Sequence, residues 1–489
     1  MTDSPGSSGL SRRRFLAASM LVTAGTGMSI AQAAEQSQPE THEKPLPITH
    51  ILADWAAHCS PSEVPRAAKT EAVRSLVNWT AVTIGGSQQP AVNIALATLA
   101  PFACSPAICL LGRAERLDVL RGALVTGISA HVLDFDDTDL QTIIHPTGSI
   151  ASALFSLCQQ HSISGADLLH AFIVGVEVEC RLGRAIYPSH YQMGWHITGT
   201  CGAFGSAAAC GRLLGLDTAR MQMALGIVAT EAAGLKVEFG TMCKSLNMGR
   251  AAENGLLAAL LAANGYTGAA DAIEGKDGYV QAASLHHDYG AITHGLGKDY
   301  EIMHNTYKPY ACGVVLHPVI DAILQLRRQY NLDPGQVRSI AVEANPLVLQ
   351  LTGKRNPQTG LEGKFSVYHS AAVALVRGDA GPADYTTAAV NDPEVVDLRK
   401  RVSVQVNPAI RKDEAVVTIT TATGRELKKH VEHALGSAGN ALSDADLNHK
   451  YKELVQGILP PDQSEKVLAL AWNIENLPNP AILPREAVR

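Results

Sequence analysis

Three aspartates stand close together in the segment HVLDFDDTD, within a stretch that is otherwise apolar. Asp134 and Thr138 are four residues apart, a spacing that would place both side chains on one face of a helix. Carboxylates this close repel one another, so at least one of Asp134, Asp136 and Asp137 should be paired with a cation or have a raised pKa. That arrangement suits a proton-transfer site. A Mg²⁺ or Ca²⁺ site and a solvated helix end are the alternatives.

Two copies of the pattern H-x-T-G place a histidine and a threonine before a run of small residues. His145 begins the first copy, and His196 and Thr198 belong to the second. Each copy predicts a loop that ends at a helix N-terminus, where free N–H groups and the positive end of the helix dipole attract anions. Two such sites suit a substrate with several carboxylates. The alternative is ordinary N-capping by the threonine beside a structural histidine.

Two lysines complete the set of residues with potential chemistry. Lys244 lies just before an apolar helix-forming run, and Lys308 lies where the sequence pattern changes. A lone lysine is usually at the surface, but both positions allow the ammonium group to point into a cleft. Arg250 follows Lys244 closely. The segment KFSVYH, which contains Tyr368 and His369, opens a further helix and carries little weight by itself.

The composition excludes several other classes of protein. The chain has 489 residues, 46% of them hydrophobic and 18% charged, as expected for a globular protein of two domains. Lys and Arg number 40 against 46 Asp and Glu, and the net charge of −6 argues against nucleic-acid and anionic-membrane partners. The nine cysteines form no C-x-x-C pair, and the G-x-G-x-x-G, Walker A, H-E-x-x-H and G-x-S-x-G motifs are absent.

The elements that must position these residues change character along the chain. Up to about residue 303 the apolar spacing is helical, and runs such as Ala203–Leu214 are apolar all round, which predicts buried helices. Val402, Val404 and Val406 then alternate with polar residues and predict a half-buried strand, and a Thr-Gly turn after a second such run predicts a hairpin. We therefore expect a mostly α protein, with a helical domain built from both chain ends and an inserted α+β lid. The expected parts are helical at 49–303, α+β at 304–438 and helical again at 439–489.

The first residues resemble an export signal. Ser11–Leu16 reads SRRRFL, the twin-arginine pattern, and a charge-free stretch leads to an A-x-A cleavage site at Ala31–Ala33. We expect residues 1–33 to be a signal peptide, residues 34–48 to be a linker and the mature protein to be periplasmic. An uncleaved membrane anchor is the alternative, although the stretch is weakly hydrophobic. No other segment is long and apolar enough to span a bilayer, so we expect no membrane contact after cleavage.

Five motifs, in order along the chain, resemble those of the MmgE/PrpD family. They read AHVLDFDDTD with HPTGS, SHYQMGWHITGTCGAFGSAAA, GTMCKSLNMGRAAENGLLAALLA, YKPYACGVVLHP and KFSVYHSAAVAL, and the resemblance covers about residues 49–480. It implies a helical domain made from both chain ends, an α+β lid and a homodimer formed through the helical domains. The activities that it implies include 2-methylcitrate dehydration, cis-aconitate decarboxylation and iminodisuccinate epimerisation, with no metal and no organic cofactor.

The resemblance and the chemistry together assign a candidate site. The catalytic candidates are Asp134, His145, His196, Lys244 and Lys308, and the substrate-binding candidates are Thr138, Thr198, Arg250, Tyr368 and His369. A histidine can move a proton at a carbon next to a carboxylate while the lysines stabilise the negative charge that develops. In the decarboxylases of the family a tyrosine stands near the position of His369, which leaves the reaction open.

Three functions agree with these residues. The leading one is a cofactor-independent lyase for a small di- or tricarboxylic acid, most simply a hydro-lyase like 2-methylcitrate dehydratase. An epimerase or racemase on a similar acid would need the same proton abstraction, and a decarboxylase on such an acid is a further alternative. The alternative outside enzymes is a periplasmic protein that binds polycarboxylates without turnover, although passive capture has no need for clustered aspartates and two histidines.

Overall fold

The first part of the fold is mostly helical. The computed structural model describes residues 46–489, so the predicted signal peptide and most of the predicted linker lie outside the described residues. The helices of this part are α1 (Ile48–His58), α2 (Arg66–Gly86), α3 (Pro90–Leu99), α4 (Val119–His131), α5 (Pro146–Leu157), α6 (Gly165–Ile186), α7 (Ser189–Gln192), α8 (Ile197–Leu213), α9 (Thr218–Glu231), α10 (Cys243–Ala263), α11 (Tyr279–Ala283) and α12 (Gly290–Thr293). Two short strand pairs accompany them, β1 (Ile108–Cys109) with β2 (Arg116–Leu117) and β3 (Thr138–Asp139) with β4 (Asn305–Thr306).

The centre of the helical part is α8, which packs against α5, α6 and α10. Every residue from Ile197 to Gly211 is buried, which confirms the prediction of a buried helix in this region. Small residues allow the close approach: a Cβ added at Gly205 would lie 2.9 Å from the backbone oxygen of Gly175 in α6. At interhelical contacts this tight, an added methyl group has no space.

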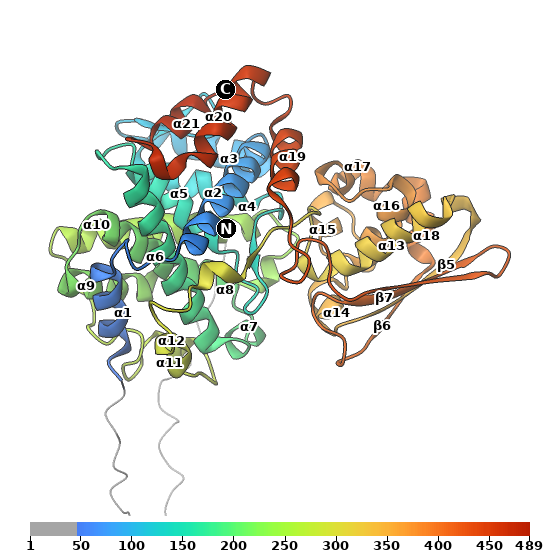
Figure 1. Cartoon of the computed structure of the whole chain (residues 1–489), viewed down its shortest axis with the longest axis horizontal. Coiled ribbons are helices and arrows are strands. Elements are labelled where there is room, and N and C mark those ends of the chain that lie inside the picture. Colours follow the sequence, from blue (N-terminus) through green and yellow to red (C-terminus); the bar gives the residue numbers. More distant parts are fainter. Residues whose placement is uncertain (1–45) are drawn as a thin grey trace, which may run out of the picture. The chain divides into compact units, whose positions relative to one another are not determined.

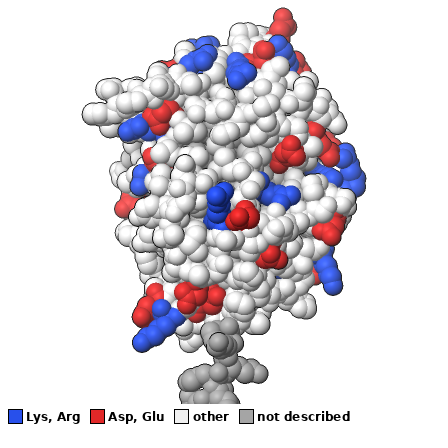
Figure 2. Space-filling view, turned by 90° about the vertical axis from the view of Figure 1, so that its left-hand side faces the viewer, with Lys and Arg blue, Asp and Glu red and all other residues white. Residues whose placement is uncertain are grey.

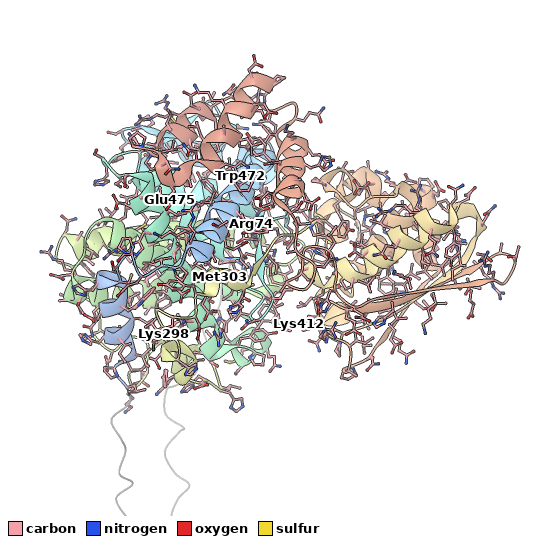
Figure 3. The ribbon with its side chains drawn as sticks, in the orientation of Figure 1. Arg74, Lys298, Met303, Lys412, Trp472 and Glu475 are labelled. Carbon is pink, nitrogen blue, oxygen red and sulfur yellow. The ribbon has the colours of Figure 1, made fainter. Side chains whose placement is uncertain are left out.

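The helical part is completed by the C-terminal end of the chain. Its helices are α19 (Asp444–Val455), α20 (Pro461–Trp472) and α21 (Ile482–Glu486). Both α19 and α20 pack against α2, so segments from the two chain ends lie side by side (Figure 1). Arg74 of α2 forms an ion pair with Asp444 at the start of α19, and both Arg74 and Trp472 of α20 are labelled in Figure 3. The prediction of one helical domain from both chain ends is confirmed.

Between these two helical segments lies an α+β part. Its elements are α13 (His317–Tyr330), β5 (Val337–Ala344), α14 (Leu347–Thr352), α15 (Gly360–Gly363), α16 (Val367–Arg377), α17 (Thr387–Val390), α18 (Pro393–Lys400), β6 (Val402–Val406), β7 (Ala415–Thr421) and β8 (Glu426–Val431). The sheet has the order β6-β5-β7-β8, with β5 and β6 parallel and the other neighbours antiparallel. The expected hairpin is β7–β8, and α13, α16 and α18 run along one side of the sheet (Figure 1).

Two surface features complete the description. In residues 46–489, none of the helices has the length and apolar character needed to cross a membrane. Figure 2 shows the face on the left-hand side of Figure 1, where α1, α9 and α10 lie, and charged side chains on this face are few and scattered. The homodimer and the domain boundaries at 303/304 and 438/439 stay predictions.

Candidate active site

Asp134 lies in a loop and not on a helix. The preceding helix α4 ends at His131, and the backbone of Asp134 has φ +48°, in the left-handed region that aspartate tolerates better than most residues. Thr138 belongs to strand β3. The expectation that Asp134 and Thr138 share a helix face is therefore wrong, because the helix ends before Asp134 and Thr138 lies in a strand. In this loop the Asp134 carboxylate faces two lysines from distant parts of the sequence.

Asp134 is the centre of a buried ion cluster. Its Oδ1 accepts hydrogen bonds from Lys244 Nζ at 2.7 Å and from Lys308 Nζ at 2.9 Å, and the carboxylate is almost fully buried. Burial acts to raise the pKa of Asp134, but the ammonium groups of Lys244 and Lys308 hold it well below its usual range. Burial lowers the pKa of Lys244, and Asp134 opposes this change. Two cations thus face one anion, which leaves an excess of positive charge for a bound carboxylate.

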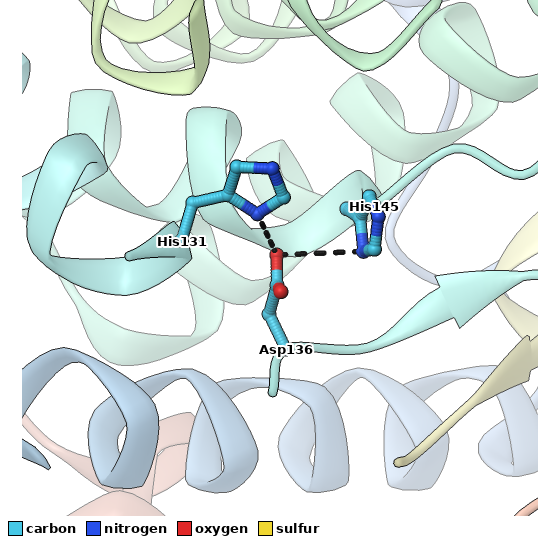
Figure 4. A group of neighbouring side chains, drawn as sticks. All are labelled: His131, Asp136 and His145. Carbon is cyan, nitrogen blue, oxygen red and sulfur yellow. Dashed lines mark hydrogen bonds and ion pairs between the residues drawn. The ribbon is translucent and has the colours of Figure 1, made fainter. Parts of the chain in front are cut away.

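Asp136 lies between two histidines (Figure 4). Its Oδ2 accepts a hydrogen bond from His131 Nδ1 at 2.7 Å, and His145 Nδ1 lies 3.5 Å from the same oxygen. Burial acts to raise the pKa of Asp136, but His131 and His145 hold it well below its usual range. His131 was not among the predicted site residues. The sequence offered one indication that His131 belongs to the site, its position five residues before Asp136, but this spacing is common by chance.

His145 is held as a neutral imidazole that can accept a proton. Its Nδ1 donates to the backbone oxygen of Asp137 at 2.8 Å, because a carbonyl can only accept, so Nε2 carries the lone pair. Thr138 Oγ1 lies 3.2 Å from the same Nδ1. Burial, with Lys308 and Lys244 in support, lowers the pKa of His145 well below its usual range, although Asp136 opposes this change.

His196 has the opposite tautomer. The side-chain amide nitrogen of Asn247 donates to His196 Nδ1 at 3.1 Å, so the proton of the neutral imidazole is on Nε2. Burial lowers the pKa of His196 well below its usual range, and Lys244 adds to the effect. The ring also packs edge-on against Phe239, with centroids 5.1 Å apart. One histidine is therefore set to accept a proton at Nε2, and the other to donate one.

A hydrogen bond joins the two H-x-T-G segments. His145 and His196 are themselves the N-cap residues of α5 and α8, and neither makes a side-chain capping hydrogen bond. Thr198 Oγ1 accepts a hydrogen bond from the backbone N–H of His145 at 3.2 Å, and Thr198 is fully buried. N-capping by the threonines, the alternative considered from the sequence, is thus wrong. Thr198 supports the other segment and does not line the cavity described next.

One cavity brings the catalytic candidates together. It lies where the helical part meets the α+β part, because Leu351, Thr352 and Phe365 of the α+β part contribute to its wall. The polar side of its wall is formed by Asp134, His145, His196, Lys244 and Lys308, and the apolar side mainly by Ile143, Tyr191, Phe239, Val314, Val315, Leu351 and Phe365. All five residues predicted as catalytic therefore line one cavity.

Three of the predicted substrate-binding residues lie away from this cavity. Arg250 is on α10, where the helical period turns it away from Lys244, and it pairs with Glu253 at 2.5 Å on an exposed face. His369 is buried inside the α+β part, where its Nε2 donates to the backbone oxygen of Asp384 at 2.9 Å. Tyr368 lies beneath the guanidinium of Arg355, 4.9 Å from it. None of the five predicted substrate-binding residues, Thr138 and Thr198 included, belongs to the cavity wall.

The three clustered aspartates do not converge on one point. Asp134 faces the lysines, and Asp137 Oδ2 accepts from Thr147 at 2.5 Å and from Asn305 at 2.6 Å. Among the described residues, the group whose atoms lie close enough to hold a metal ion is His131, Asp136 and His145, with one atom of each within 4.8 Å of the others. These atoms are already linked by hydrogen bonds and ion pairing, so the group has a role without a metal.

The fold and the site define a cavity lined by buried histidines, lysines and an aspartate, where a helical part meets an α+β part. Models of the MmgE/PrpD family match the chain in two domains, the N-terminal domain at residues 50–291 and the C-terminal domain at residues 310–476. The chain belongs to the MmgE/PrpD family.

The curated relatives include cis-aconitate decarboxylases from a fungus and from mammals. The protein from Aspergillus terreus is 26% identical over 459 residues, which cover 88% of this chain and 94% of the relative. The protein from Mus musculus is 26% identical over 387 residues, covering 76% of this chain and 78% of the relative. The protein from Homo sapiens is 25% identical over 384 residues, covering 75% and 79%. These identities support lyase-type action on a polycarboxylate.

Proposed function

We propose that the protein is a lyase that acts next to a carboxylate of a small di- or tricarboxylic acid, without a metal or an organic cofactor. The observation that carries the proposal is the pair of opposite tautomers on one cavity wall. His145 offers a lone pair at Nε2 and His196 offers a proton at Nε2, and both line the cavity that Lys244 and Lys308 also line. Acid, base and cations are thus present at one location.

The proposed reaction begins with removal of a proton from the carbon next to a carboxylate. His145 Nε2 accepts the proton, and negative charge develops on the carboxylate oxygens. Lys244 and Lys308, which are both buried, stabilise this charge. For dehydration, His196 Nε2 donates its proton to the leaving hydroxyl group, so that a C–O bond breaks as a C=C bond forms and water departs.

Decarboxylation is the second candidate, favoured by the names of the relatives. There the C–C bond to the leaving carboxylate breaks, carbon dioxide departs and the remaining carbanion takes a proton from His196. The tyrosine-for-histidine difference expected from the family resemblance falls at His369, which is buried away from the cavity. That difference therefore gives no argument against decarboxylation. Dehydration remains the leading proposal because it uses both tautomers in a single turnover.

The experiment is incubation of the purified protein with citrate, 2-methylcitrate and cis-aconitate in D₂O, followed by NMR. Loss of water, loss of carbon dioxide and deuterium exchange without elimination identify a hydro-lyase, a decarboxylase and an epimerase, respectively. Binding without any of these changes would identify a periplasmic binding protein and contradict the proposal. The His145→Ala variant is the control for catalysis by a contaminant.

Metal removal gives an independent check of the proposal. We expect activity to survive EDTA treatment and dialysis, because the lysines and not a metal ion stabilise the developing charge. Loss of activity on chelation, with recovery on adding a divalent cation, would instead assign catalysis to a metal at His131, Asp136 and His145. A periplasmic location and a homodimer complete the proposal.

A further inference from the structure

Three successive backbone carbonyl groups of the Asp134 loop each accept a hydrogen bond from a different lysine. The oxygen of Leu133 accepts from Lys364 Nζ at 2.6 Å. The oxygen of Asp134 accepts from Lys308 Nζ at 3.0 Å, and the oxygen of Phe135 accepts from Lys450 Nζ at 2.7 Å. Lys364 belongs to the α+β part and Lys450 to helix α19, so the loop is held from both sides.

The outer two lysines also hold the segment that carries Lys308. Lys364 Nζ donates to the backbone oxygen of Ala311 at 2.7 Å, and Lys450 Nζ donates to the backbone oxygen of Lys308 at 2.9 Å. Each ammonium group therefore joins one carbonyl beside Asp134 to one carbonyl in 308–311. These two bridges, one through Lys364 and one through Lys450, thus hold the Asp134 loop and the Lys308 segment at fixed positions relative to each other.

An ammonium group is well suited to bridge buried backbone carbonyl groups of two segments, because it has three N–H donors. The left-handed backbone at Asp134 turns these carbonyls away from any helix or sheet partner, and a buried carbonyl without a donor is costly. Lys450 uses its three N–H groups fully, because its third acceptor is Asn78 Oδ1 at 2.8 Å. Both Lys364 and Lys450 are almost fully buried, and neither lines the cavity that contains the two histidines. Their effect on chemistry must pass through other residues.

We propose that Lys364 and Lys450 are positioning residues of the active site, whose ammonium groups hold Asp134 and Lys308 in the arrangement that stabilises the developing negative charge. The inference rests on the proposed lyase function. It assigns two residues from distant parts of the chain, one in the α+β part and one in the C-terminal helices, to the geometry of the same loop.

The charges around the two ammonium groups make the arrangement sensitive to pH. Burial lowers the pKa of Lys364 to about 8 and that of Lys450 to about 7. The groups that face Lys364 are Asp134, Lys244, Lys308, Cys312 and the Tyr385 ring, and those that face Lys450 are Asp136, Asp137, Lys308 and the Phe135 ring. Deprotonation removes one N–H and the positive charge, so turnover should fall as pH rises through these values.

The test compares Lys364→Met and Lys450→Met with Lys354→Met and Lys452→Met, two exposed lysines that pair with Glu362 and Glu465. The first two variants should lose about 10²-fold in kcat, as displacement of a catalytic group does, while KM changes less than about threefold. The controls should match the wild type. Wild-type kcat in both buried variants would overturn the proposal.

Arginine variants give the second measurement. A guanidinium stays protonated throughout the working range, so both arginine variants should retain part of kcat. Lys450→Arg should move the alkaline fall in kcat from about pH 7 toward pH 8, and Lys364→Arg should make the fall less steep. An alkaline fall that stays in place in both variants would belong to another group, such as Lys244, and would contradict the proposal. If the methionine variants fail to fold, the pH dependence of kcat in the arginine variants still tests the positioning role.

Crystal structures separate failure of this inference from failure of the proposed function. In Lys364→Met or Lys450→Met the distance of 2.9 Å between Lys308 Nζ and Asp134 Oδ1 should lengthen, whether or not the wild type is active on carboxylic acids. If no variant folds, wild-type crystals transferred to pH 9 should show the same lengthening. An unchanged distance would overturn the positioning role, whereas an inactive wild type would overturn the lyase function alone.

Discussion

At the level of single residues, substitution of the cavity lysines and of the cavity histidines should affect different kinetic parameters. Lys244→Met or Lys308→Met removes one of the two cations at Asp134, so kcat/KM should fall by about 10²-fold or more. His145→Ala and His196→Ala should lower mainly kcat, because they move protons and contribute less to holding the substrate. Steady-state kinetics with calorimetric binding of a citrate-like acid measures both effects. Histidine variants that lose binding but keep turnover would show that the acid–base assignment is wrong.

Asp137 should make stability depend on pH. Burial, with Asp136 in support, raises its pKa from 3.8 to about 6. The folded protein therefore keeps Asp137 neutral while the unfolded chain ionises it, so this residue's contribution to the free energy of unfolding falls as pH rises from about 4 to about 6. The shift corresponds to about 3 kcal/mol. In Asp137→Asn, the decline in the free energy of unfolding over this range should be smaller than in the wild type. Denaturant unfolding at several pH values measures it, and equal declines would contradict the raised pKa.

At the level of the elements, close packing of α8 against α10 should tolerate no added methyl group. A Cβ at Gly255 would lie 2.6 Å from the backbone oxygen of Ala203, and backbone cannot move aside cheaply. Gly255→Ala should lower the free energy of unfolding by about 1–3 kcal/mol despite its better helix propensity. Gly211→Ala is the matched control, because its Cβ would meet the flexible end of Met221 at 2.9 Å. Equal stability of the two variants in denaturant unfolding would contradict this reading of the contact.

The helices and strands also show which features the sequence could predict and which it could not. Helical and alternating periods identified the buried α8 and the hairpin β7–β8 because each pattern extends over several residues. The pairing of β3 with β4 joins two strands of two residues each, too short to produce a pattern, and it brings the loop after Asp134 beside Lys308. Arg250 and His369 were misplaced for a related reason: proximity in sequence to a cavity residue does not give the direction in which a helix turns the side chain.

For the whole molecule, the predicted export signal should be separable from the fold. The first described helix, α1, begins at Ile48, so a chain that begins at Ala34 keeps every described helix and strand. We expect it to melt at the temperature of the full-length chain and to have the same activity, and we expect N-terminal sequencing of protein from the native host to begin at Ala34.

A chain that begins at Trp55 is the matched control. It loses the buried Ile48 and the hydrogen bond of 2.5 Å from Thr49 to Glu274, so it should melt at a lower temperature. Full-length protein in the cytoplasm with Met1 intact would contradict export, and a lower melting temperature of the Ala34 chain would show that the signal contributes to the folded state.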